Sequence, residues 1–166
     1  MTLRQWGAAD LPLLQRANAP EMTTHLAGPE TEEQVRERHE KYLRLWREGA
    51  ARMFVVEEDG RASGGIGCWT TEWDGRMVHE TGWFIVPEAQ GRGIGHAAVA
   101  LIIQDTRAHR THRLLTAFPA IDNLPSNALC AGAGFTFDST QSFPFRGQTL
   151  TSNVWVLDLE AASTAA

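Results

Sequence analysis

Three glycines at alternate positions separate an apolar stretch from a run rich in alanine and isoleucine, in the segment VPEAQGRGIGHAAVALII (residues 86–103). Glycine permits left-handed backbone conformations and lets another group approach the chain closely. A strand, a glycine loop and a helix in this order are typical of anion binding, because successive N–H groups point into one concavity and the helix N-terminus adds partial positive charge. The segment therefore predicts an anion-binding loop, and a pyrophosphate is the ligand we expect.

Two common phosphate-binding loops do not fit this segment. The dinucleotide fingerprint is G-x-G-x-x-G within an early βαβ unit, whereas G-x-G-x-G here follows a series of predicted antiparallel strands. A Walker loop needs Gly-Lys-Ser/Thr, and Arg92 is followed by Gly93. Spacing alone leaves one alternative open, which is a glycine-rich turn in front of a buried helix.

Chain length, net charge and cysteine content place further limits on function. A chain of 166 residues suits one domain with a core, 1–166, and a formal net charge of −5 argues against a nucleic-acid partner and favours cationic small molecules or basic peptides. No apolar run approaches the roughly 18 residues that span a bilayer, so we expect no membrane association. Two cysteines without ligand spacing, and no signal peptide, favour a cytoplasmic protein. His109 and His112 lack a third ligand nearby, and we expect no metal.

Periodicity and turn residues predict a mixed α/β (α+β) fold with a mostly antiparallel central sheet flanked by helices. Asp-Gly pairs separate the second, third and fourth of the predicted strands, which favours hairpins. The predicted strands are 2–6, 52–58, 62–73, 77–86, 113–118, 135–138 and 153–159. The predicted helices are 10–17 (capped by Asp10), 31–48 (with a Thr31/Gln34 capping box), 95–109 and 123–135. We expect the tail, 159–166, to be frayed.

Two spaced motifs carry a family resemblance. QGRGIG (90–95) matches the Q/R-x-x-G-x-G/A motif of the GNAT superfamily of acyl-CoA-dependent N-acyltransferases, and NLPSNALCAGAGF (123–135) resembles its N-x-x-S-(x)7-G-F segment. HETGWFIVPEAQGRG (79–93) is similar to the branch that includes ribosomal-protein N-terminal acetyltransferases, which also has members that acetylate antibiotics and small amines. The resemblance is close over about 80–138 and follows the order of elements over the whole chain.

This resemblance implies acetyl-CoA as the acyl donor. The loop residues expected to bind its pyrophosphate, mainly through backbone N–H groups, are Gln90, Gly91, Arg92, Gly93, Ile94, Gly95 and His96. Ile85 and Val86 would offer backbone groups to the pantetheine arm, with the Ile85 N–H as oxyanion donor and a bulge separating this strand from its parallel neighbour. Asn123, which shares its motif with Ser126, would hydrogen-bond the pantetheine. Two alternatives stay open: Arg92 as a solvated loop residue, and Asn123 as a helix cap.

The implied chemistry is direct attack of a neutral amine on a thioester. Deprotonation at pH 7 costs roughly 4.6 kcal/mol for a lysine-type amine and roughly 1.4 kcal/mol for an α-amine, so a base matters most for the former. Glu80 is our candidate base, with an exposed carboxylate or a substrate anchor as its alternatives, and at most one of His79 and Glu80 can point inward. Many family members have a tyrosine acid where this chain has Cys130, which could act as a weak acid or pack in the core.

The sequence thus predicts an N-acetyltransferase that moves an acetyl group to a primary amine, with a peptide N-terminus, an aminoglycoside, a polyamine and an amino acid as possible acceptors. A non-catalytic acyl-CoA-binding or regulatory module is the first alternative, and a dinucleotide-binding oxidoreductase is a more distant one. Segments 20–28, with Glu21 and His25, and 140–153 are expected to be acceptor-side loops. A homodimer is possible, since dimers are common in the family.

Overall fold

Two Asp-Gly turns fold residues 51–85 into the predicted meander. In the computed structural model, which describes residues 1–161, both residues of each turn have positive φ: Asp59 (51°), Gly60 (75°), Asp74 (51°) and Gly75 (71°). These turns join the strands β2 (Ala51–Glu58), β3 (Arg61–Trp73) and β4 (Arg76–Ile85). The hairpin prediction is confirmed, because such turns match the twist of antiparallel strands.

Seven strands in the described part of the chain form one sheet in the order β1-β2-β3-β4-β5-β7-β6. The remaining strands are β1 (Thr2–Gln5), β5 (Leu114–Ala117), β6 (Thr136–Phe145) and β7 (Gln148–Asp158). β4 and β5 pair in parallel, and the other neighbours pair antiparallel. The predicted mixed, mostly antiparallel sheet is therefore confirmed.

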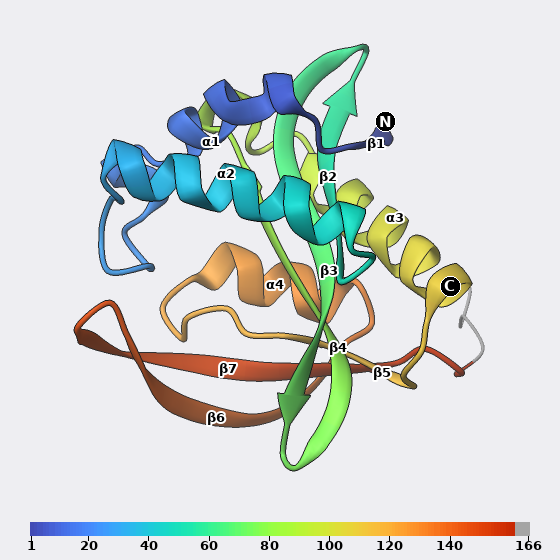
Figure 1. Ribbon diagram of the computed structural model, residues 1–166. Coiled ribbons are helices and arrows are strands. Elements are labelled where there is room, and N and C mark those ends of the chain that lie inside the picture. Colours follow the sequence, from blue (N-terminus) through green and yellow to red (C-terminus); the bar gives the residue numbers. More distant parts are fainter. Residues whose placement is uncertain (162–166) are drawn as a thin grey trace.

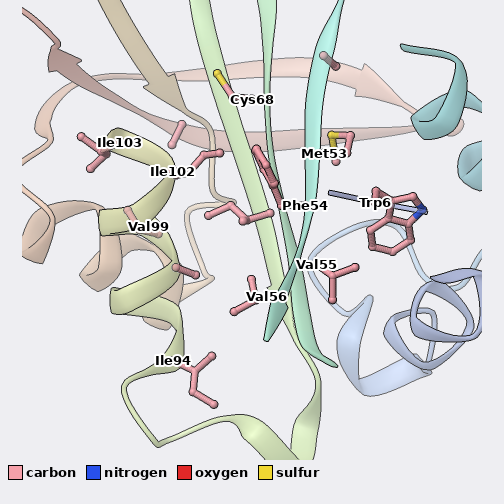
Figure 2. Packing of buried hydrophobic residues seen from close by; sticks show 14 of the residues in the cluster. Trp6, Met53, Phe54, Val55, Val56, Cys68, Ile94, Val99, Ile102 and Ile103 are labelled. Atoms are coloured by element: carbon pink, nitrogen blue, oxygen red, sulfur yellow. The ribbon is translucent and has the colours of Figure 1, made fainter. Parts of the chain in front are cut away.

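Helices cover both faces of this sheet. The α-helices are α1 (Leu11–Ala17), α2 (Glu32–Arg47), α3 (Ile94–His109) and α4 (Leu124–Gly132), and short 3-10 helices are η1 (Ala8–Asp10), η2 (Pro20–Met22) and η3 (Pro87–Ala89). α1 and α2 lie on one side of the strands and α3 on the other (Figure 1). Figure 2 shows this division at residue level: Val55 points to the side of Trp6, and its neighbour Val56 points to the side of Ile94. Both valines are fully buried, so the core has two layers with the sheet between them.

Helix starts were predicted with mixed success. Thr31 Oγ1 accepts a hydrogen bond from Gln34 N (3.2 Å) and Gln34 Oε1 accepts one from Thr31 N (2.9 Å), which confirms the capping box. Asp10 does not cap α1 with its side chain. Its carboxylate instead accepts hydrogen bonds from the Arg4 guanidinium (2.8 and 3.0 Å) and from the Gly7 N–H (2.7 Å), because these donors lie on the β1 side.

The C-terminal third differs from the prediction in two places. Segment 140–153 is not a loop, since it belongs to the long β6–β7 hairpin, whose turn is Arg146 (φ 48°) and Gly147 (φ 75°). Leu159 is not frayed: its side chain is 3 % exposed and its N–H donates to the Arg113 carbonyl (2.9 Å). The rest of that expectation, for 162–166, lies outside the described residues.

Candidate active site

β4 and β5 separate after a very short parallel contact. Their register has only two pairs, His79 with Leu115 and Glu80 with Thr116, whereas β4 remains paired with β3 as far as Ile85. Beyond β5 the chain follows β7 instead, with a bridge between Ala120 and Ser152. The edge of β4 beyond Glu80 therefore has no strand partner on the β5 side, and we refer to this unpaired edge, together with the segment after β5 opposite it, as the slot. The β3–β4 register runs without a shift, so the bulge expected there is absent from that ladder.

The Ile85 N–H faces this slot. The Val86 N–H donates to Ser63 O (3.0 Å), which makes Ser63 and Val86 a hydrogen-bonded pair of the antiparallel ladder. Such pairs alternate with pairs that are not hydrogen-bonded, so the backbone groups of Ile85, which is paired with Gly64, point away from β3. Gln90 Nε2 donates to the Ile85 carbonyl (2.8 Å) and fixes that peptide unit.

The backbone groups of Val86 already have hydrogen-bond partners within the protein. Its N–H is bound by Ser63, its carbonyl accepts from Ala89 N (2.9 Å), and its side chain is 1 % exposed. The Val86 N–H is therefore not free for a ligand, whereas its carbonyl oxygen can accept a second hydrogen bond.

The glycine loop leads into the N-terminus of α3. Gly91 (φ 71°) and Gly93 (φ 78°) are left-handed, and an added Cβ would meet nothing within 4 Å at either position. Gly93 is the N-cap, and its carbonyl accepts the first helical hydrogen bond, from Ala97 N (3.2 Å). The N–H groups before Ala97 therefore have no intrahelical acceptor. They belong to Gly93, Ile94, Gly95 and His96, which are four of the predicted loop residues.

Gly95 has a packing role that the motif did not reveal. A Cβ built on Gly95 would lie 3.0 Å from Leu129 Cδ1, so glycine allows α3 and α4 to approach closely. The His96 ring lies over the second helix of this contact, since a Cβ on Gly132 would lie 3.1 Å from His96 Nε2. Arg92 forms an ion pair with Glu58 at the end of β2. Its guanidinium has a partner in the protein but is 53 % exposed, so the alternative of a solvated loop residue stays open.

The second motif of the sequence, at residues 123–135, begins with the residue that caps α4. Asn123 Oδ1 accepts a hydrogen bond from Ser126 N (3.2 Å), so the cap alternative for Asn123 is confirmed and Ser126 contributes its backbone N–H. Cys130 lies inside the core with no exposed surface, and burial raises the pKa of its thiol to about 12. A buried thiol with a raised pKa is a poor proton donor at neutral pH, so the structure favours the core alternative over the acid.

Glu80 and His79 point to opposite faces of the sheet. A Cβ on Gly95 of α3 would lie 3.9 Å from Ile85 Cγ1, so Ile85 and, by alternation, His79 face α3. Glu80 therefore faces the side of α1 and α2. His79 Nε2 accepts from Thr111 N (3.1 Å) and His112 N (3.3 Å), which gives it a structural role. Burial raises the Glu80 pKa to about 6, and the neighbouring Trp69 acts in the opposite direction.

Asn127 is a residue that sequence reasoning missed. Its Oδ1 accepts hydrogen bonds from Asn153 Nδ2 (2.8 Å) and Trp155 Nε1 (2.9 Å), and its Nδ2 donates to Ala120 O and Asn123 O (both 2.9 Å). The amide thus ties α4, β7 and the segment after β5 together beside the slot. Its position one helical turn after Asn123 was the one available signal, and nothing in the sequence identifies the partners.

A cavity of about 540 Å³ is lined in part by segment 20–28, for which the sequence predicts an acceptor-side role. Three parts of the chain line it: the segment Thr24–Gly28, residues 120–122 after β5, and the start of β7 at Gln148–Thr151. His25, one of the predicted acceptor-side residues, reaches Asp122 across its mouth, with Nδ1 3.0 Å from Oδ1. Glu21, the other, is exposed on η2 and does not line the cavity.

Comparisons with known proteins agree with this geometry. The model of the acetyltransferase (GNAT) domain family matches residues 1–136, so the chain belongs to that family. A search of curated proteins found no significant match. No helix within residues 1–161 has both the length and the apolar character required to cross a membrane.

Solved structures extend the similarity to almost the whole chain. The ribosomal-protein-alanine N-acetyltransferase from Brucella melitensis is 26 % identical, with a TM-score of 0.78 and coverage of 95 % of this chain and 99 % of that one. RimL, a ribosomal L7/L12 α-N-protein acetyltransferase in complex with coenzyme A, is 19 % identical (TM-score 0.80; coverage 96 % and 94 %). The spermidine N-acetyltransferase from Vibrio cholerae, in complex with CoA and spermine, is 18 % identical (TM-score 0.77; coverage 95 % of each chain).

Proposed function

We propose that the protein transfers an acetyl group from acetyl-CoA to a primary amine by direct attack within a ternary complex. The observation that carries this proposal is the juxtaposition of the α3 N-terminus with the open edge of β4. Membership of the GNAT family supports it, as do the similar structures solved with CoA.

The residues present fit a CoA molecule. The free N–H groups at Gly93–His96, together with the loop at Gly91, form a concave set of donors of the kind that binds a pyrophosphate. Arg92 would contribute charge only if it left Glu58. The pantetheine arm would then enter the slot beside Ile85, whose N–H faces it. An N–H donor at a developing oxyanion contributes about 3 kcal/mol in comparable sites.

The transfer forms a bond from the amine nitrogen to the acetyl carbon and breaks the carbon–sulfur bond of the thioester. Glu80 takes the proton of the amine, directly or through water, from the face of the sheet opposite to α3. A base with a pKa of about 6 is mostly ionised at neutral pH and can accept that proton. The thiol of CoA, with a pKa near 8.5, can leave as thiolate at a cost of only about 2 kcal/mol at pH 7.

Calorimetric titration with CoA tests the binding half of the proposal. Gly93→Glu should abolish binding, because its side chain occupies the donor concavity. Gly60→Glu is the matched control: Gly60 also has positive φ (75° against 78°) and open surroundings, so both variants bear the same backbone strain. Equal CoA affinity in the two variants would refute the pyrophosphate site.

Acetylation of a panel of amines by acetyl-CoA tests the catalytic half. We expect transfer to at least one acceptor, with release of one thiol per amide formed. Tight CoA binding without transfer to any α-amine, polyamine or aminoglycoside would instead favour the non-catalytic acyl-CoA-binding module.

A further inference from the structure

His79 connects β4 to the part of the chain that leads into β5. Its Nε2 accepts hydrogen bonds from the N–H groups of Thr111 (3.1 Å) and His112 (3.3 Å), in the turn between α3 and β5. Its carbonyl oxygen accepts another from Thr116 Oγ1 (2.9 Å), within β5. His79 also pairs with Leu115 in the parallel register of the two strands. The closed end of the slot is therefore built around this residue.

The two ring contacts require one particular form of the imidazole. A ring nitrogen accepts a hydrogen bond only when it carries no proton, so the proton of the neutral His79 ring must be on Nδ1. Protonation of Nε2 turns the acceptor into a donor that faces two other donors, the N–H groups of Thr111 and His112. A positively charged His79 therefore cannot hold the turn.

The surroundings of His79 favour the neutral ring. His79 is only 7 % exposed, and the His112 ring lies beside it, with the two ring centroids 5.2 Å apart. Burial, and to a lesser extent the charge of His112, lowers the pKa of His79 below the ordinary range of a histidine. The hydrogen bonds to the turn are therefore present at neutral pH and are lost as the pH falls through this lowered pKa.

Several other ionisable side chains lie on the elements around His79. They are Asp105, Arg107 and His109 on α3, Arg110, His112 and Arg113 in the turn, and Glu72 on β3, whereas β5 has the uncharged sequence LLTA. Asp105 binds the Arg52 guanidinium (2.6 and 2.7 Å), and Arg113 binds Asp158 of β7. Among the ionisable neighbours, His112 is the one whose charge lowers the pKa of His79.

We propose that His79 is a positioning residue for the transfer reaction: its neutral ring, with the proton on Nδ1, holds the α3–β5 turn against β4 and so sets the distance between the two sides of the slot. The two sides begin directly beyond these contacts, after Glu80 on β4 and after Ala117 on β5. The inference rests on the proposed function, because the slot is where the pantetheine arm would lie beside Ile85.

Nuclear magnetic resonance on protein labelled with ¹³C and ¹⁵N reads the state of the ring directly. At pH 7.5 we expect the Nδ1–H tautomer of His79, identified by the ring carbon and nitrogen shifts. As the pH is lowered, the amide resonances of Thr111 and His112 should change with the same midpoint as the His79 ring. An Nε2–H tautomer, or a protonated His79 ring with no change at these two amides, would overturn the inference.

Two substitutions separate the acceptor from the bulk of the ring. His79→Gln keeps an acceptor near the position of Nε2 but cannot titrate, and His79→Leu removes the acceptor. In calorimetric titrations with CoA at pH 7.5, His79→Gln should bind within twofold of the wild type and His79→Leu at least fivefold more weakly. His109→Gln, an exposed histidine at the end of α3, is the control and should match the wild type.

The pH dependence of CoA affinity is a readout that a merely structural role would not move. One pH unit below the midpoint of the His79 ring, the wild type should bind CoA at least fivefold more weakly than His79→Gln, since protonation of CoA itself affects both equally. Equal affinities there, or equal affinities of His79→Leu and His79→Gln at pH 7.5, would overturn the inference. The first comparison decides the matter if His79→Leu does not fold. A wild type that fails to bind CoA at pH 7.5 would instead contradict the proposed function.

Discussion

Gln90 Nε2 lies 2.8 Å from the carbonyl oxygen of Ile85, and this hydrogen bond joins the glycine loop to the last residue of β4. The loop and the proposed oxyanion donor are thus parts of one unit, since the Ile85 N–H and C=O lie on the same edge of the strand. The position of a pyrophosphate at α3 would then set the position of the thioester at β4.

Gln90→Ala should therefore reduce kcat/KM for acetyl-CoA about fivefold, because a neutral hydrogen bond contributes about 1 kcal/mol. Steady-state kinetics at saturating amine give this value. Gln141→Ala, on β6, is the control and should match the wild type. A Gln90→Ala enzyme with unchanged kcat/KM would mean that Ile85 is held well enough by its pairing with Gly64.

The Glu80 pKa of about 6, raised by burial, predicts the pH dependence of transfer. A base works when ionised, so kcat/KM for a lysine-like amine should rise as the pH increases through 6. Glu80→Gln should remove this inflection and lower kcat/KM at pH 7 about 100-fold. Glu72→Gln, an exposed carboxylate on β3, controls for charge. If Glu80→Gln raised KM and left kcat intact, Glu80 would be a substrate anchor.

The raised pKa of Glu80 also predicts that Glu80→Gln increases the stability of the protein. Since the Glu80 pKa is raised from 4.5 to about 6, the folded state binds the proton more tightly than the unfolded state. The stabilisation from this proton is fully present below pH 4.5 and is lost as the pH rises through 6. Glu80→Gln should thus increase the free energy of unfolding by up to about 2 kcal/mol at pH 8 and change it little at pH 4. Urea unfolding at the two pH values measures both.

Cys130 should prove dispensable for proton transfer. Because its thiol is fully buried and has a pKa raised to about 12, Cys130→Ala should leave the pH–rate profile unchanged. The lost packing should reduce the free energy of unfolding by about 1 kcal/mol. A displaced alkaline limb in the pH–rate profile of Cys130→Ala would restore the acid hypothesis.

Asn127 should matter for stability more than its half-buried position suggests. Asn127→Leu leaves the Asn153 amide N–H and the Trp155 indole N–H without their acceptor, whereas the Ala120 and Asn123 carbonyls keep their bonds from backbone N–H groups. We expect a loss of about 2–4 kcal/mol in the free energy of unfolding, because unsatisfied polar groups keep their desolvation cost. Denaturant titration measures this loss of stability. Asn18 is unsuitable as a control, because its side chain also makes two hydrogen bonds. Gln141→Ala again provides the reference.

Local signals in the sequence were sufficient for much of the fold. The Asp-Gly turns, the Thr31/Gln34 capping box and the change of period at the glycine loop each depend on neighbouring residues, and each was predicted correctly. The family resemblance was likewise confirmed by the match over residues 1–136.

What the sequence could not supply were partners distant along the chain. Asp10 looks like a cap until Arg4 and Gly7 compete for its carboxylate, and Arg92 looks free until β2 places Glu58 beside it. The His25–Asp122 contact joins residues 97 positions apart. The length of β6 was also hidden, because its pairing with β7 overrides the polar, loop-like composition of 140–153.

The short contact between β4 and β5 divides the sheet into a four-stranded part, β1–β4, and a three-stranded part, β5–β7. Two residue pairs and the hydrogen bond from Thr116 Oγ1 to His79 O (2.9 Å) form the seam. A rotation of one part against the other would therefore break few backbone hydrogen bonds while changing the width of the opening between them. A ligand bound between the two parts should therefore change the hydrogen-exchange rates most at the amide protons of this seam.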